Sequence, residues 1–291
     1  MLRIPGTALV KIIRTLHSLV ARSQRLTLSH EWNATLYHQI SGPQVSWGKK
    51  VLARVSLRGD ERVLDAGCGT GRLTRDLLES LPHGQVFALD VSQNMIDAAR
   101  DYLQPDFGAR VQFVRCDLLE LAFDREFDGI FSTASFHWVL DHDRLFRNLY
   151  RALRPGAWLI AQCGGGRNLA RLLGRVHALI ESPAYAKYFV DYPFPWEFSD
   201  AETAAGRLRL AGFTEVETSL EEAPTSFPNE IEYQRFVESV ILRNHLPRIP
   251  DSASRENFLA ELTRQAATDD PPFVLDYWRL NLQGRKAVVS S

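Results

Sequence analysis

The stretch VLDAGCGTGRL, residues 63–73, decides the fold of this chain. A short apolar run leads into three glycines at alternate positions, Gly67, Gly69 and Gly71, and a helical pattern follows them directly. Because glycine has no Cβ, the backbone of such a loop can lie close to a ligand, and the helix N-terminus beyond it offers unpaired N–H groups. The pattern therefore predicts a strand, a ligand-binding loop and a helix, in that order.

Strand-like and helix-like segments alternate from residue 61 onward. The predicted strands are 62–67, 85–90, 111–116, 127–132 and 157–162. The predicted helices are 71–81, 92–103 with Ser92 as N-cap, and 142–153, which Pro155 and Gly156 bring to an end. Regular alternation of this kind predicts a doubly wound α/β fold, in which a parallel sheet carries helices on both faces and binds ligands beyond the carboxyl ends of its strands.

The regular alternation of strand-like and helix-like segments ends after residue 163. Residues 164–199 combine a glycine-rich turn, a basic helical piece and the aromatic segment AYAKYFVDYPFPWEF, which we interpret as a lid or insertion over the sheet edge. The remaining predictions are a helix at 200–211, a strand at 213–220, helical stretches at 229–245 and 252–267, and a last strand at 273–282. We therefore expect one domain, residues 31–291, with insertions at about 164–199 and 227–270.

Composition narrows the class of protein. The chain has 291 residues, 45% of them hydrophobic, and a formal net charge of −1, so nothing favours nucleic acid as a partner. The three cysteines, Cys68, Cys116 and Cys163, are widely spaced and form no CxxC pair. That spacing fits neither a disulfide framework nor a zinc site, so we expect no metal and a reducing, cytoplasmic location.

Residues 1–30 differ from the rest because they carry five arginines and lysines and no acid. Apolar residues recur there at helical spacing, which makes this a basic, amphipathic N-terminal extension. It can be a leading helix that packs on the body or stays loose, a targeting peptide, or a helix in weak contact with a membrane surface through residues 1–28. Charges interrupt its apolar runs well before the roughly 20 residues that span a bilayer.

Three acidic residues and one arginine indicate what the glycine loop binds. Asp90 ends the second predicted strand, where a carboxylate can accept hydrogen bonds from ribose hydroxyls, so NAD and S-adenosylmethionine both fit. A dinucleotide loop would need glycine at position 72, which is Arg72. Asp65 at the mouth of the loop would repel phosphates and attract an ammonium group. Asp117 follows the third strand, where it can accept the adenine amine while Cys116 and Leu118 line the ring. Together these signals favour S-adenosylmethionine.

The segments VLDAGCGTG, ALDVSQNM, CDLLEL, FDGIFSTASFHWVLD and LRPGAWLI, within about residues 32–165, resemble the class I S-adenosylmethionine-dependent methyltransferases. This resemblance implies a Rossmann-like, mostly parallel seven-stranded sheet. WNATLYHQISGPQVSWGKKVL and SFHWVLD are similar to the trans-aconitate methyltransferase group, whose relatives methylate malonyl-acyl-carrier protein or juvenile hormone acid. The resemblance therefore implies O-methylation of a carboxylate on a small-molecule acid by a chain that we expect to be monomeric.

The resemblance also implies site residues. Carboxylate contacts are expected from Gln44 and Trp138, and His137 lies beside them. The implied cofactor contacts, with Asp65 and Leu118 added from the sequence argument, are Tyr37, Asp65, Gly67, Cys68, Gly69, Asp90, Met95, Asp117, Leu118 and the main chain from Ser132 to Ala134.

Several of these residues have ordinary structural explanations. Met95 can be a core residue of its helix, Trp138 and Phe136 can be aromatic packing under the lid, and His137 can be a surface histidine. The acceptor is open as well. A carboxylate is ionised at neutral pH and needs only donors, whereas a hydroxyl or amine would need a base, for which His137 is suited. Five arginines can hold further carboxylates, namely Arg167, Arg171, Arg175, Arg243 and Arg279.

Two other classes of function stay open on the sequence. A nicotinamide-dependent oxidoreductase would share the fold, although Arg72 and Asp65 leave poor room for a pyrophosphate. A non-catalytic subunit that binds a nucleoside would share both the fold and the loop. Binding of S-adenosylhomocysteine against NADH separates the first class, and transfer of a labelled methyl group separates the second.

Overall fold

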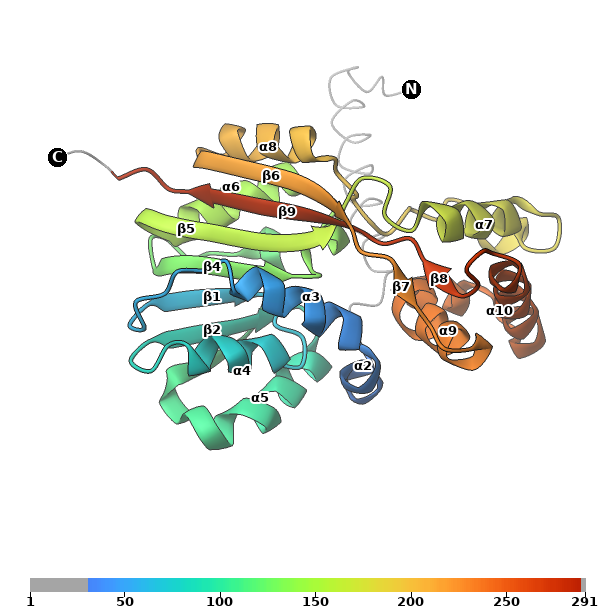
Figure 1. Ribbon diagram of the computed structural model, residues 1–291, viewed down its shortest axis with the longest axis horizontal. Helices are drawn as coiled ribbons and strands as arrows, with labels where there is room; N and C mark the ends of the chain where they lie inside the picture. Colours follow the sequence, from blue (N-terminus) through green and yellow to red (C-terminus); the bar gives the residue numbers. More distant parts are fainter. Residues whose placement is uncertain (1–30, 289–291) are drawn as a thin grey trace, which may run out of the picture. The chain divides into compact units, whose positions relative to one another are not determined.

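The computed structural model describes residues 31–288, so the predicted extension at 1–30 lies outside the described residues. Its main sheet has seven strands in the order β3-β2-β1-β4-β5-β9-β6, and only β9 runs antiparallel to its neighbours (Figure 1). The strands are β1 (Arg62–Ala66), β2 (Gln85–Asp90), β3 (Val111–Arg115), β4 (Phe127–Thr133), β5 (Leu153–Gly164), β6 (Thr214–Glu222) and β9 (Trp278–Arg285). The predicted doubly wound, mostly parallel seven-stranded sheet is confirmed.

Alternation along the central strands divides the apolar side chains between two cores. Val63 on β1 packs with α3 (Gly42–Leu52), α4 (Arg72–Glu79) and α5 (Gln93–Phe107) on one face of the sheet. Leu64, the next residue, packs with α6 (His142–Ala152) and α8 (Ala201–Leu210) on the other. Successive side chains of a strand point to opposite faces, so a strand buried on both sides needs apolar residues throughout.

A third core lies beyond the carboxyl ends of β5 and β6. It belongs to what we call the helical insert, residues 169–198 and 229–267, shown to the right of the sheet in Figure 1. The insert contains α7 (Ala170–Glu181), η4 (Ala186–Tyr188), α9 (Glu230–Phe236), the π-helical turn η5 (Val237–Ile241), η6 (Leu242–Asn244), η7 (Leu246–Arg248) and α10 (Ser252–Ala267). It has its own buried aromatic centre around Tyr233 and Phe258.

Two sequence predictions need correction. The expected last strand at 273–282 is two strands, because β8 (Val274–Leu275) pairs with β7 (Thr225–Ser226) in a separate small sheet before β9 begins at Trp278. The expected helix at 229–245 is α-helical only to Phe236 and then passes into the π and 3₁₀ turns of η5 and η6. In the first place the chain passes from the small sheet to the main sheet, and in the second the type of helix changes inside the insert. Local periodicity reveals neither change, because tertiary contacts decide both.

The helix starts follow elementary capping chemistry. Ser92 caps α5 by accepting the N–H of Met95, as the sequence predicts, and Asp141 caps α6 by accepting the N–H of Arg144. Gly71 has a φ of +82° at the start of α4, and a Cβ there would lie 2.8 Å from a side-chain carbon of Leu103 on α5. This third loop glycine therefore serves close packing between helices. Within residues 31–288, no helix combines the length and apolar character needed to cross a membrane.

Candidate active site

One pocket opens at the carboxyl edge of the sheet, between the glycine loop, the end of β4 and the two N-terminal helices α2 (Ala34–Ile40) and α3. It brings together half of the residues predicted for the site. These are Tyr37, Gln44, Asp65, Gly67, Cys68, Gly69 and Ala134, and the pocket is completed by Ser41, Val45, Thr70, Arg72, Leu73 and Thr133. Ala134 has a φ of +54°, a backbone conformation that non-glycine residues rarely adopt and that is concentrated at functional sites.

Asp90 is fixed at the end of β2 by the loop itself. Its Oδ2 accepts the N–H of Gly69 at 3.0 Å, and its Oδ1 accepts the N–H of Ser92 at 2.9 Å. Burial raises the pKa of this carboxyl group, and the backbone hydrogen bonds oppose that rise. A carboxylate has about four lone-pair sites, so these bonds leave room for hydroxyl groups of a ligand.

Asp65 is deeper than the sequence suggests. The side chain is only 2% exposed, and its Oδ2 accepts the Thr74 hydroxyl at 2.6 Å. Burial raises the pKa of Asp65 to about 7. The carboxyl group still lines the pocket, and a cationic group entering there would favour its ionised form. An ammonium group fits this environment.

Helices α2 and α3 supply three polar side chains to the pocket. Tyr37 lies on α2, Ser41 lies between the two helices, and Gln44 lies in the first turn of α3. The Ser41 hydroxyl and Gln44 Oε1 are buried and find no hydrogen-bond partner among residues 31–288. Burial raises the pKa of Tyr37 to about 12, so its phenol stays protonated and can donate. Unsatisfied buried groups are costly, which makes a polar ligand the natural partner.

Five of the predicted cofactor residues lie outside the pocket lining, namely Asp90, described above, and the four that follow. Met95 is buried in the first turn of α5. Asp117 accepts the N–H of Leu119 at 2.8 Å and so begins η2 (Leu118–Glu120), whose Leu118 packs in the core. The Ser132 hydroxyl donates to the carbonyl of Ala66 at 2.6 Å, which joins β4 to β1 and leaves only its main chain for a ligand. The contacts of Met95, Asp117 and Leu118 with an adenine ring, and of the Ser132 main chain with the cofactor, stay predictions.

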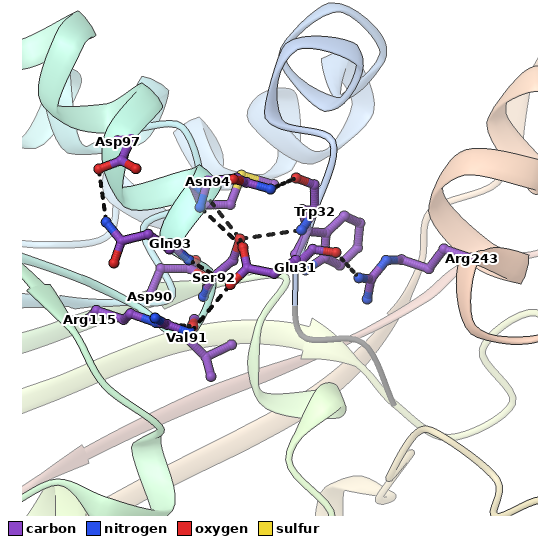
Figure 2. A network of polar contacts seen from close by, with 11 residues as sticks. Glu31, Trp32, Asp90, Val91, Ser92, Gln93, Asn94, Asp97, Arg115 and Arg243 are labelled. Carbon is purple, nitrogen blue, oxygen red and sulfur yellow. Dashed lines mark hydrogen bonds and ion pairs between the residues drawn. The ribbon is translucent and has the colours of Figure 1, made fainter. Parts of the chain in front are cut away.

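A further element was missed by the sequence argument. Figure 2 shows Glu31 and Trp32 hydrogen-bonded to the start of α5, and we call this pair of residues the clasp. The Glu31 carboxylate accepts the Ser92 hydroxyl at 3.0 Å and the N–H groups of Gln93 and Asn94 at 3.2 Å each. The Trp32 N–H donates to the Ser92 hydroxyl at 3.3 Å. A carboxylate at a helix N-terminus is favoured by the helix dipole. The sequence gives no signal for this contact, because Gln93 follows Glu31 by 62 residues and only the fold brings them together.

The Trp32 ring joins two parts of the site. Its centroid lies 5.3 Å from that of Tyr37, which lines the pocket, and 5.5 Å from that of Trp138. The Arg243 guanidinium lies 3.9 Å above the Trp32 ring and donates to the carbonyl of Glu31 (Figure 2). Burial lowers the pKa of Arg243 to about 10. The clasp therefore lies beside Asp90 on one side and the helical insert on the other.

His137 has a defined hydrogen-bonding role. Its Nδ1 lies 3.2 Å from the backbone N of Gly164, and because that N–H can only donate, Nδ1 must accept. Burial lowers the pKa of His137 well below its usual value, and the nearby Arg279 cation lowers it further. The neutral ring therefore carries its proton on Nε2. His137 can offer a hydrogen-bond donor to a ligand, while its acceptor nitrogen is already used.

Trp138 is part of an aromatic row that reaches from the sheet into the insert. Its ring centroid is 5.5 Å from Trp32 and 5.5 Å from Trp196, and Trp196 stacks at 5.4 Å on His245. Phe136 is fully buried and packs edge-on against Phe146 of α6. The aromatic packing considered for both residues is present, and a contact of Trp138 with a carboxylate stays a prediction.

The five candidate arginines differ in their surroundings. Arg171 and Arg175 on α7 both form ion pairs with Asp269, so they stabilise the insert. Arg167 is exposed beside the Trp278 ring. Arg279 is only 2% exposed and lies 4.5 Å from the ring of Trp47, while Arg243 lies over Trp32. Only these last two face the residues of the site.

Comparisons with known proteins agree with this geometry. A family model described as a methyltransferase domain matches residues 63–156. The trans-aconitate 2-methyltransferase of Acidovorax ebreus (strain TPSY) is 37% identical over 133 residues, which are 46% of this chain and 50% of that protein. The trans-aconitate 2-methyltransferase of Mycolicibacterium gilvum (strain PYR-GCK) is 31% identical over 236 residues, 79% of this chain and 88% of that protein.

Solved structures share the fold. The phosphoethanolamine N-methyltransferase 2 of Haemonchus contortus, solved with S-adenosyl-L-methionine, superposes with a TM-score of 0.57 at 21% identity, covering 87% of this chain and 56% of that chain. Sheet order, glycine loop and acidic strand end define the class I methyltransferase architecture. The chain belongs to the S-adenosylmethionine-dependent methyltransferases, in the family of the trans-aconitate 2-methyltransferases. Its match spans about half the length of the Acidovorax relatives.

Proposed function

We propose that this protein transfers a methyl group from S-adenosylmethionine to a carboxylate oxygen of a small acid. The observation that carries the proposal is the state of His137, whose Nδ1 accepts the Gly164 N–H and whose pKa lies well below its usual value. A hydroxyl or amine acceptor would need a base to remove its proton. A carboxylate is already ionised at neutral pH and needs only the donor that His137 offers.

The pocket residues and Asp90, which is hydrogen-bonded to Gly69 of the pocket, fit the proposed cofactor. Asp90 would accept hydrogen bonds from the ribose hydroxyls, and Asp65 would face the methionine ammonium group. Gly67 and Gly69 would let the backbone lie against the ligand, with Tyr37 supplying a polar contact. Bound S-adenosylmethionine supplies a methyl group on a positively charged sulfur.

Positioning and exclusion of water are the main tasks of the protein in such a transfer. The accepting carboxylate loses its negative charge as the positive charge on sulfur disappears, so water, which stabilises the separated charges, slows the reaction. Holding the two groups in line can contribute up to ~7–11 kcal/mol in favourable cases. Gln44 and His137 would orient the carboxylate, and the aromatic row of Trp32, Trp138 and Trp196 would keep water away.

The test is methyl transfer by the full chain to a panel of mono-, di- and tricarboxylic acids that includes trans-aconitate. We expect one acid to gain one methyl group as a base-labile ester, detected by mass spectrometry. With the cofactor saturating at every pH, we also expect kcat/KM for the acid to vary by no more than about twofold between pH 6 and 8, because carboxyl groups of small acids titrate near pH ~4.

His137→Gln should keep that flat profile, and His177→Gln, a change at a histidine whose side chain is 73% exposed, is the matched control. An acidic limb of unit slope that His137→Gln abolishes would move the proposal to a hydroxyl or amine acceptor. Cofactor binding without methyl transfer to any acid or lysate acceptor would instead favour a non-catalytic nucleoside-binding protein.

A further inference from the structure

Arg279 is a buried cation beside α3, the helix that carries Gln44. It is the second residue of β9 and pairs with Gly164 at the end of β5 and with Glu221 on β6. Its side chain is almost fully buried, and its guanidinium lies 4.5 Å from the ring of Trp47 on α3. Burial lowers the pKa of Arg279, which reflects the cost of removing the charge from water.

No carboxylate among residues 31–288 forms an ion pair with Arg279. Its Nε donates a long hydrogen bond of 3.4 Å to Gln162 Oε1, and Gln162 in turn donates to Glu221 and Asn281. Glu221 is already paired with Arg54 at 3.6 Å. Buried charges in proteins are normally paired, because an uncompensated one is strongly destabilising. Arg279 therefore lacks the direct anionic partner that its burial calls for.

The surroundings of Arg279 place it beside the methyl-transfer residues. Trp47, which covers it, is one turn along α3 from Gln44, whose Oε1 has no partner in the described part of the chain. Gly164, which pairs with Arg279, donates to His137. The positive charge of Arg279 also lowers the pKa of His137 and of Tyr37. One cation thus faces residues from α2, α3 and the loop after β4.

We propose that Arg279 binds a second anionic group of the acceptor, a carboxylate that is not methylated. This inference rests on the proposed function. A guanidinium on the reacting carboxylate would stabilise the ground state more than the transition state, in which that negative charge is lost, and would slow the transfer. On a second carboxylate the ion pair persists through the reaction and holds the acceptor in place. The acceptor would then carry at least two carboxylates.

The experiment compares acids that differ in the number of carboxylates. Kcat/KM is measured for trans-aconitate and for a monocarboxylic acid of similar size with the parent, Arg279→Met and Arg279→Lys. We expect the parent to prefer the polyacid, and Arg279→Met to lose about tenfold to hundredfold in kcat/KM for it, mainly through KM. The monoacid should change by no more than about threefold. Arg279→Lys, which keeps the charge and loses the planar fork, should lie between.

Arg54→Met is the matched control, since Arg54 belongs to the same polar network but its side chain is 42% exposed and ion-paired. It should leave the ratio of the two acids unchanged. Because that ratio is taken within one protein sample, a partly misfolded variant does not alter it. A ratio that survives Arg279→Met unchanged would overturn the proposal.

Two other results would also overturn it and can be told apart. If Arg279→Met weakens binding of S-adenosylhomocysteine by more than about fivefold, Arg279 holds the carboxylate of the cofactor instead. If the parent methylates no carboxylic acid at all, the proposed function fails first, and the Arg279 assignment fails with it. Unchanged calorimetric affinity for S-adenosylhomocysteine together with a collapsed acid ratio is the supporting result.

Discussion

The cofactor pocket and the neighbouring acceptor region, by which we mean Gln44, His137, Trp138 and Arg279, are built in different ways. The pocket depends on the glycine loop and on Asp90, whose two oxygens accept backbone N–H groups from residues 69 and 92. The acceptor region depends on side chains from α3, the loop after β4 and the start of β9. A backbone site tolerates varied side chains around it, whereas a side-chain site can change its ligand with a single substitution.

This difference predicts that the two regions can be damaged separately. Asp90→Ala would have the largest effect in the cofactor pocket, because it removes the acceptor of two backbone N–H groups as well as the proposed ribose contacts. Each lost charge-assisted hydrogen bond costs about 1.5–3 kcal/mol, so we expect calorimetric affinity for S-adenosylhomocysteine to fall at least a hundredfold. Asp97→Ala, at an exposed position on α5, is the control. An affinity within twofold of the parent would contradict the assignment of Asp90.

The sequence predicted the cofactor half far better than the acceptor half, for a physical reason. Gly67, Gly69 and Asp90 are contiguous with the strands that carry them, so local pattern and topology suffice to bring them together. Arg279 lies more than two hundred residues from Gln44, and its role depends on a sheet pairing and on the absence, within the described residues, of a carboxylate that forms an ion pair with it. From the sequence alone, five arginines were equally good candidates for binding a carboxylate. Ion pairing with Asp269 removed two of them.

The central strands were predictable because they are buried on one or both faces and so carry a clear apolar pattern, whereas β6 has only alternating half-buried residues. The split between β8 and β9 was not, since residues 273–282 read as one continuous strand. The backbone N–H of Tyr277 there bonds to Leu275 as the chain crosses from the small sheet to the main one. Which sheet a residue joins is decided by tertiary contacts.

Asp65 should make binding in the cofactor pocket depend on pH. Its pKa is raised by burial to about 7, and an ammonium group favours the ionised form. Below pH 7 the carboxyl group binds a proton that the cofactor must displace, so affinity for S-adenosylhomocysteine should fall by up to about tenfold between pH 7 and pH 6. Calorimetry at both values checks this. Asp65→Asn should abolish the pH dependence, and a parent affinity that does not change with pH would contradict the ammonium contact.

A substitution in the clasp shows whether the clasp supports the cofactor pocket or the acceptor region, because Trp32 contacts Tyr37 on one side and Trp138 on the other. Burial alone would raise the pKa of Glu31, but its hydrogen bonds at the start of α5 and the Arg115 cation lower it. Glu31→Gln keeps an acceptor and removes the charge, a change worth about 0.3–1 kcal/mol at a helix N-terminus. We therefore expect a loss of about twofold to fivefold in S-adenosylhomocysteine affinity.

With the cofactor saturating, kcat/KM of Glu31→Gln for the acid should stay within twofold of the parent. The same holds for the control Glu79→Gln, because the side chain of Glu79 is 58% exposed. A larger loss in acid turnover than in cofactor affinity would assign the clasp to the acceptor region, with Arg243 as the link between Glu31 and the helical insert.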